Sequence, residues 1–215
     1  MVESPIYLIR HGESVANTEG IYQGQTYDTD LSSLGRKQAC ALAERLEQEP
    51  IARLVASPLK RTRQTAETIA NRHQGLVIEC EPKIMETNHG AWEGRHIEDI
   101  IVHWPHEYRT WQERPSQVLF PAGEAFADTY SRTLAWWDGV TQEACGLIVV
   151  VTHDNIIRAL LVGTLGQRID EMWGYVLQPA AITKVTVIDG EARVNVINDT
   201  KHLEGLQANL AKHAL

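Results

Sequence analysis

The fold prediction starts from Pro5-Ile6-Tyr7-Leu8-Ile9-Arg10-His11-Gly12-Glu13, near the start of a chain of 215 residues. The first half of this stretch is a short run of strand-forming residues, and the run stops abruptly at an arginine and a histidine. Such a pattern is typical of a buried strand that ends in a loop. We therefore expect a strand over residues 5–9, with Arg10 and His11 at its carboxyl end.

Beyond this strand, strand-like and helix-like patterns alternate along the chain. Ser32 or Ser33 can cap a helix whose apolar residues recur at helical spacing as far as Leu46, and Pro50 follows it. Further strands are expected at 53–56, 76–78 and 147–152, further helices at 62–70 and 155–165, and a hairpin at 182–197 around Asp189-Gly190. This alternation predicts an α/β fold: a three-layer α/β/α sandwich with a mixed, mostly parallel sheet.

The least regular region is 87–123, which contains three tryptophans, four histidines and three prolines. We expect it to be a substrate-covering insertion of short helix and loop, within a single domain that spans 1–215. For Trp92, Trp104 and Trp111 we favour packing over substrate contact. We interpret 103–106 as a loop, because Pro105 prevents the regular helical face that a paired metal-ligand motif uses.

Composition narrows the classes of function. The formal charge of −8 and the lack of a Lys/Arg run disfavour nucleic acid and membrane surfaces as partners. No stretch approaches the roughly 20 apolar residues that span a bilayer, and no secretion signal is evident, so we expect a cytoplasmic protein. Cys40, Cys80 and Cys145 are expected to be reduced, mostly packed thiols. His73, His202 and His213 are expected to face solvent.

Charged residues follow three of the expected strands. They are Arg10 with His11, the segment 57–61, and His153. The carboxyl ends of parallel strands share one edge of a sheet, so these clusters should converge there, with Arg63 as a further candidate. Arginine presents forked donors that match phosphate oxygens, and an imidazole can attack phosphorus. The sequence therefore predicts a phosphate site.

Four ordered motifs resemble the histidine phosphatase superfamily, also called phosphoglycerate mutase-like. They are Leu8-Ile9-Arg10-His11-Gly12-Glu13-Ser14 with Asn17, Ser57-Pro58-Leu59-Lys60-Arg61 with Thr65, Glu86 followed by Gly90-Ala91-Trp92-Glu93-Gly94, and Val151-Thr152-His153-Asp154-Asn155. Their order and spacing match the family over essentially the whole chain.

The resemblance implies a phosphatase that hydrolyses small-molecule phosphate monoesters through a phosphohistidine on His11. Arg10, Arg61 and His153 would hold the non-bridging oxygens. Glu86 would protonate the leaving oxygen and later activate water, which requires a raised pKa. Neither a metal ion nor an organic cofactor is expected. The implied partner is a small phosphorylated metabolite, and the resemblance leaves a homodimer open.

Further positions match binding residues of the family. Asn17, Gln23 and Gly24 match residues that contact phosphate or substrate. Ser57 could orient the phosphate clamp or cap the following helix. Gly12 is expected to be small because the backbone must pass close to the phosphate and to the His11 ring.

Two other functions stay open at this point. Phosphoglycerate mutase relatives carry a Tyr and a Lys around the segment matching 89–97 and an Arg pair further on, whereas this chain has His89, Ile97 and no Arg-Arg pair. The segment 121–124 instead resembles the phosphatase branch, although Ala125 replaces a serine that could cap the next helix. An inactive phospho-ligand-binding protein is disfavoured because the catalytic set is intact.

Overall fold

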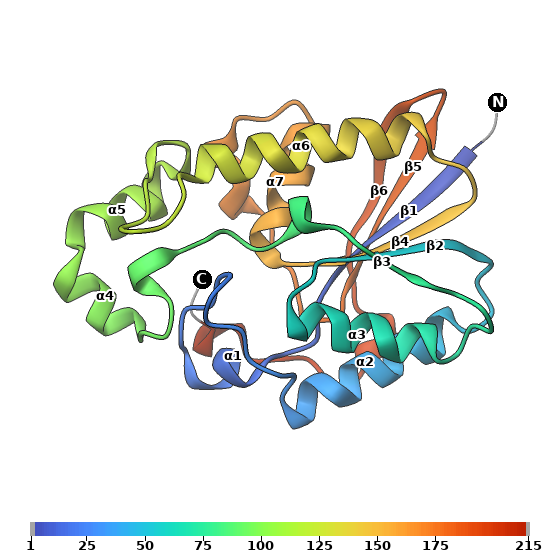
Figure 1. The fold of residues 1–215 in the computed structure, drawn as a ribbon, viewed down its shortest axis with the longest axis horizontal. Helices are drawn as coiled ribbons and strands as arrows, with labels where there is room; N and C mark the ends of the chain where they lie inside the picture. The colour runs from blue at the N-terminus through green and yellow to red at the C-terminus, as the bar shows by residue number, and fades with distance from the viewer. Residues whose placement is uncertain (1–2, 214–215) are drawn as a thin grey trace.

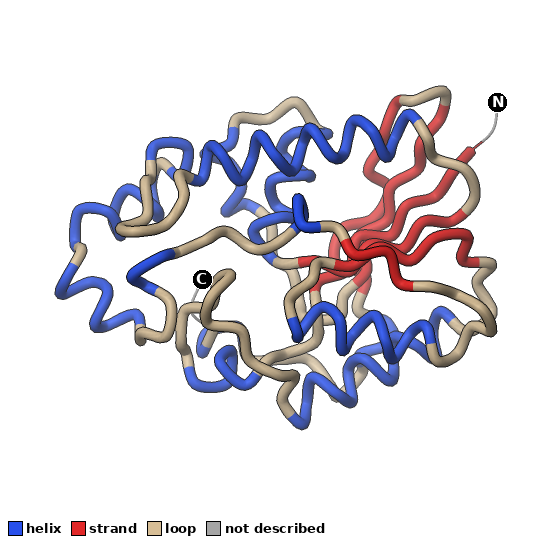
Figure 2. The backbone as a smooth tube through the Cα atoms, viewed as in Figure 1, coloured by secondary structure: helices blue, strands red, loops and turns tan. Residues whose placement is uncertain are grey.

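The computed structural model describes residues 3–213 and contains a six-stranded sheet between two layers of helices (Figures 1 and 2). The strands are β1 (Glu3–Arg10), β2 (Ile51–Ala56), β3 (Ile78–Cys80), β4 (Leu147–Thr152), β5 (Ile182–Ile188) and β6 (Glu191–Asp199), in the spatial order β3-β2-β4-β1-β5-β6. The first four run parallel, whereas β5 and β6 pair antiparallel. The predicted three-layer sandwich with a mixed, mostly parallel sheet is confirmed.

Helices cover both faces of the sheet (Figure 1). α2 (Ser33–Leu46) and α3 (Lys60–Ala70) lie on one face, and α6 (Phe126–Gln142) and α7 (Asp154–Thr164) lie on the other. β4 is buried along its whole length because it pairs on both edges and is covered on both faces. Within residues 3–213 no helix has the length and apolar character needed to cross a membrane.

Local signals explain where several elements begin and end. Ser32 caps α2 by accepting a hydrogen bond from the Gly35 amide at 2.9 Å, as one of the two predicted caps. Asp189 and Gly190 both have positive φ, at 51° and 84°, as a two-residue hairpin turn requires. Ala125 precedes α6 without a side-chain cap, so the missing hydroxyl is not replaced.

The region 87–123 forms a lobe beyond one end of the sheet (Figure 1). It contains α4 (Ile97–His103), α5 (Pro105–Glu113) and 3-10 turns at Gly90–Trp92 and Pro115–Gln117. Trp92 and Trp111 are fully buried and meet Phe120 edge-on at 5.0 and 5.1 Å between ring centroids. Trp104 is partly buried in the same cluster, so the predicted packing role is confirmed. The predicted loop at 103–106 is wrong, because a proline is tolerated as the first residue of α5.

Two other sequence predictions are corrected. The third strand lies at 78–80 and not at 76–78, because its pairing with β2 begins at Ile78 opposite Leu54. All three cysteines are free, as expected, but they are exposed. Cys40 lies on the outer face of α2, Cys80 lies in the edge strand β3, and Cys145 lies in the connection to β4. Cysteine is often buried in proteins, but here other apolar residues of the same elements fill the buried positions, and the three cysteines lie outside them.

The histidines expected at the surface are more buried than predicted. His213 is only 8% exposed, because the 3-10 turn at Leu210–Lys212 folds back onto α1 (Val15–Glu19). His202 and His73 are half-buried. The chain's last described residues therefore approach the end of β1.

Two glycines let α2 approach the loop that follows β1. A Cβ atom on Gly35 would lie 1.9 Å from the Glu13 carbonyl oxygen, and one on Gly12 would lie 2.6 Å from the Gly35 carbonyl oxygen. Besides the expected closeness to the His11 ring, the backbone of α2 thus limits the space at Gly12. The close approach fixes the loop that carries His11.

We predict that Gly35→Ala destabilises the protein by about 1–3 kcal/mol, because the added methyl group must push α2 away from Glu13. Urea unfolding measures the change. The matched control is Gly139→Ala on the exposed face of α6, where a Cβ meets nothing within 4 Å. This control should gain about 0.5–1 kcal/mol. Equal effects of the two substitutions would contradict the close packing at Gly35.

Candidate active site

The three charged clusters meet at the carboxyl edge of β1, β2 and β4. Arg10 lies opposite Thr152 in the β1/β4 ladder, and Ala56 lies opposite Val151 in the β2/β4 ladder. A pocket at this edge is lined by Arg10, His11, Asn17, Tyr22, Gln23, Arg61, Glu86, His89, Asp154 and Asn155. Six of the nine predicted site residues thus line one pocket. The other three adjoin it: the Gly24 carbonyl oxygen accepts from Arg61, the His153 ring packs against His11, and Ser57 contacts His153.

The His11 ring is oriented by the backbone of the next residue, Gly12. Its Nδ1 lies 2.7 Å from the Gly12 carbonyl oxygen, which can only accept a hydrogen bond, so Nδ1 carries the proton. Its Nε2 is therefore the lone-pair nitrogen, and it accepts from Arg61 Nε at 3.2 Å. Burial, together with Arg61 and Arg10, holds the pKa of His11 well below its usual value. A neutral imidazole with Nε2 in the pocket can act as a nucleophile.

His153 packs edge-on against His11, with ring centroids 5.3 Å apart. Its Nε2 lies 2.8 Å from Ser57 Oγ, while its Nδ1 has no partner among residues 3–213. If Ser57 donates to Nε2, the proton of the neutral ring sits on Nδ1, where it can serve an anion. Of the two roles open for Ser57, orientation of His153 fits the geometry, because α3 is capped by Leu59 and not by Ser57.

Arg10 is 2% exposed and is held in place from two sides. It donates from NH1 to the Leu177 carbonyl oxygen at 2.6 Å, and the same nitrogen lies 3.1 Å from Asp154 Oδ1. Its Nε has no partner within the described chain. Burial lowers the pKa of this guanidinium, but from so high a value that it keeps its charge. Arg10 Nε is therefore a charged hydrogen-bond donor that is free to bind an anion.

Arg61 is 1% exposed and has partners at all three nitrogens. Besides His11, it contacts Asp28 at 2.8 Å and the Gly24 carbonyl oxygen at 3.1 Å. Asp28 also accepts from the Lys60 amide at the start of α3. Arg63, the further candidate, is exposed and pairs with Glu67 at 3.3 Å, because two positions along a helix lie on different faces. It does not belong to the site.

Glu86 is buried in the pocket wall. One carboxyl oxygen accepts from the Thr87 amide at 2.8 Å, and its backbone carbonyl accepts from Gln25 and Arg132. Burial raises the pKa of Glu86 more than the Thr87 amide and Arg61 lower it. A carboxyl group with a raised pKa keeps its proton to higher pH than a free carboxyl group and can deliver that proton to a leaving oxygen.

The predicted binding amides differ in what they can still offer. Asn17 Oδ1 accepts from the amide and the hydroxyl of Ser14, which leaves its Nδ2 for the pocket. Gln23 donates to Ser14 Oγ at 2.7 Å and accepts from Thr29 at 3.1 Å, so both ends of its amide are engaged. Asn17 can therefore donate to an anion, whereas Gln23 holds Ser14 and Thr29 in place beside the pocket.

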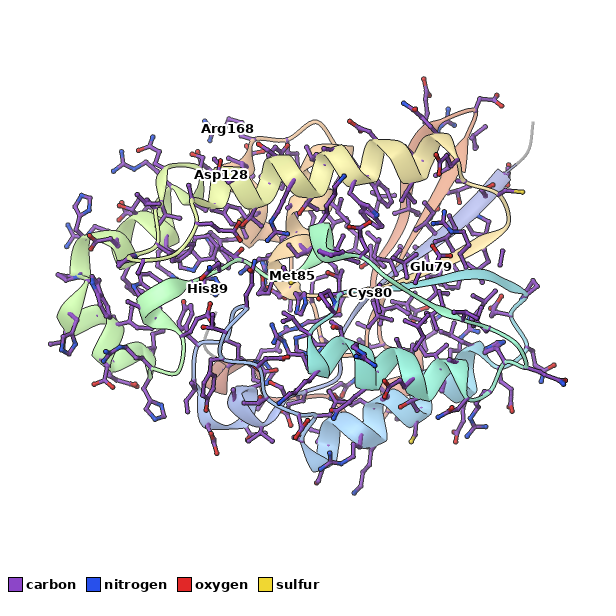
Figure 3. All side chains as sticks on the ribbon, viewed as in Figure 1. Glu79, Cys80, Met85, His89, Asp128 and Arg168 are labelled. Atoms are coloured by element: carbon purple, nitrogen blue, oxygen red, sulfur yellow. The ribbon has the colours of Figure 1, made fainter. Side chains whose placement is uncertain are left out.

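Sequence reasoning assigned no role to four residues of the lining: Tyr22, His89, Asp154 and Asn155. Asp154 pairs with Arg10 and also with Arg158, one helical turn later. The spacing of four residues between Asp154 and Arg158 is the sequence signal that could indicate this ion pair. His89 lies on the segment that runs from Met85 into the insertion (Figure 3).

His213, the last described residue, also reaches this site. Its Nε2 lies 3.3 Å from Glu13 Oε1, and its Nδ1 lies 3.4 Å from Arg10 NH2. Burial lowers the pKa of His213 to about 4. No local pattern indicates a contact between residues 200 positions apart. Within residues 3–213 there is no group of three or more His, Cys, Asp or Glu side chains placed to hold a metal ion.

Comparison with known proteins fits this geometry. The chain is 38% identical to "Phosphoserine phosphatase 1" of Hydrogenobacter thermophilus, over 92% of this chain and 93% of that protein. It is 32% identical to "Probable phosphoglycerate mutase GpmB" of Yersinia enterocolitica, over 75% of this chain and 74% of the other. Among solved structures, Bacillus stearothermophilus YhfR superposes with a TM-score of 0.86 at 27% identity, covering 93% of this chain and 98% of YhfR.

One protein-family sequence model matches almost the whole chain, from the first strand to the end of the last strand. It matches residues 6–200 and describes the histidine phosphatase superfamily, branch 1. The order and spacing of the four sequence motifs agree with this match. The chain belongs to the histidine phosphatase superfamily, branch 1.

Proposed function

We propose that this protein hydrolyses small phosphate monoesters through a phosphohistidine intermediate on His11. The observation that carries the proposal is a neutral His11 whose Nε2 shares a pocket with two buried guanidinium groups and a carboxyl group of raised pKa. The similarity to a protein named a phosphoserine phosphatase supports hydrolysis and makes O-phosphoserine the first substrate to test.

In the first step, His11 Nε2 forms a bond to phosphorus as the bond from phosphorus to the ester oxygen breaks. Glu86 gives its proton to that oxygen, and Arg10, Arg61 and His153 stabilise the non-bridging oxygens. In the second step, water attacks the phosphohistidine and Glu86 takes its proton. The bond between nitrogen and phosphorus breaks, and inorganic phosphate leaves.

Phosphoglycerate mutase is the second candidate, because one of the relatives carries that name. A mutase returns the phosphoryl group to the substrate instead of to water. The two functions separate in one assay: transfer between the 2- and 3-positions of phosphoglycerate that outruns phosphate release would favour the mutase.

A cytoplasmic location is also part of the proposal, and the three free cysteines suit a reducing compartment.

Radiolabelled substrate should place acid-labile phosphate on His11. We expect His11→Ala to abolish this label and to lower turnover at least about 10⁴-fold, because the nucleophile is gone. The exposed His106→Ala is the matched control and should retain both. Metal chelators should leave turnover unchanged. Label on a cysteine, or strict magnesium dependence, would refute the mechanism, and binding without turnover in the unaltered protein would favour the inactive-binder alternative.

Glu86 should control the alkaline limb of the pH profile. The donor is active only when protonated, so kcat/KM should fall as pH rises through the raised pKa of Glu86. The low pKa of His11 places the opposite, acidic limb well below neutral pH. Steady-state rates across pH measure both limbs.

Glu86→Gln should remove the alkaline limb and slow alkyl phosphates by about 10²–10⁴-fold. It should slow p-nitrophenyl phosphate much less, because nitrophenolate leaves without a proton. The exposed Glu113→Gln serves as the control. An equal loss for both esters, or an unchanged alkaline limb, would show that Glu86 is not the proton donor.

A further inference from the structure

Three residues of the pocket wall form a hydrogen-bond chain with a fixed direction. His89 Nδ1 lies 2.6 Å from the Gln23 backbone oxygen, which can only accept, so Nδ1 carries the proton. Burial lowers the pKa of His89 to about 4, so the ring is neutral and Nε2 is an acceptor. Asn155 Nδ2 lies 3.4 Å from that Nε2 and donates to it. The amide of Asn155 is thereby oriented.

This orientation leaves the Asn155 oxygen without a donor. Asn155 is 4% exposed and lines the same pocket as His11, and its Oδ1 has no hydrogen-bond partner among residues 3–213. The neighbouring Asp154 Oδ1 also lacks a hydrogen bond there, although it lies 3.1 Å from Arg10 NH1 as an ion pair. A buried acceptor without a donor costs free energy, so a ligand that supplies donors is favoured.

The polar atoms of the site are therefore divided by type. Arg10 Nε and His153 Nδ1 are buried nitrogens without partners in the described chain, and they suit phosphate oxygens. Asn155 Oδ1 and Asp154 Oδ1, at the start of α7, are oxygens, and they suit N–H or O–H groups. One ligand can satisfy both sets only if it carries an anion at one end and hydrogen-bond donors at the other.

We propose that Asn155 and Asp154 form a specificity site for an ammonium group on the leaving side of the substrate. An ammonium offers three N–H donors, enough for Asn155 Oδ1 and for Asp154 Oδ1, whose carboxylate already pairs with Arg10 and Arg158. A hydroxyl offers a single donor and no charge. The inference rests on the proposed hydrolysis of phosphate monoesters and narrows the substrates to amine-bearing phosphomonoesters, of which O-phosphoserine is one.

Three substrates that differ at one position test the proposal. O-phosphoserine carries an ammonium at its second carbon, 3-phosphoglycerate carries a hydroxyl, and 3-phosphooxypropanoate carries only hydrogen. The unaltered protein should show kcat/KM at least about tenfold higher for O-phosphoserine than for either analogue, because the hydroxyl leaves one of the two oxygens without a donor and the hydrogen leaves both without one. This comparison needs no substitution, so it does not depend on the folding of a variant.

Asn155→Leu assigns the preference to its residue. This change should bring the three kcat/KM values within about threefold of one another, whatever loss is common to all three substrates. The control is Asn195→Leu on the exposed side of β6, which should keep the preference. Equal kcat/KM values in the unaltered protein, a hydroxyl substrate as good as the amine, or an equal loss for all three in Asn155→Leu would overturn the inference. Failure to hydrolyse any phosphomonoester would instead overturn the proposed function.

Discussion

The site depends on holding two buried guanidinium groups beside a neutral imidazole. Buried charges are costly unless they are paired, and each arginine here has a carboxylate partner: Asp154 for Arg10 and Asp28 for Arg61. Their positive charge and the surrounding burial keep a proton off His11 Nε2. The same burial raises the pKa of Glu86. One property, the exclusion of water from the sheet edge, therefore shifts the pKa values of both the proposed nucleophile and the proposed acid.

The scaffold makes this arrangement rigid. The parallel strands β1, β2 and β4 bring segments that lie far apart in the chain to one edge, and helices cover both faces. The loop after β1 is fixed from several sides: the Gly12 amide donates to Thr65, the Glu13 amide donates to Gln38, and Gly35 contacts the backbone. On the other side of the pocket, the aromatic cluster around Trp111 and Phe120 packs against His89. Groups held in this way lose little entropy when a substrate binds.

Local sequence patterns predict most of the sheet, the helices α2, α3 and α7, and the convergence of the three charged clusters. β4 is a continuous apolar run, and α2 has a capping serine and a regular stripe, so neither needed tertiary information. Contacts set by the folded chain could not be predicted. His213 reaches Glu13 across 200 positions, and Asn155 acquires its direction only from His89 on a distant segment. The pattern around Pro105 predicts a break in helical structure, whereas Pro105 begins α5, because proline suits both a helix break and the first position of a helix.

The central claim is that the unpartnered donors around His11 converge on one tetrahedral anion. A crystal structure of the protein with orthovanadate, which imitates phosphorus during transfer, tests it directly. The account predicts vanadium bonded to His11 Nε2, with Arg10 Nε and His153 Nδ1 donating to its equatorial oxygens and a Glu86 oxygen next to the apical oxygen. Vanadate bound elsewhere, or bound in this pocket without contact to His11, would contradict it.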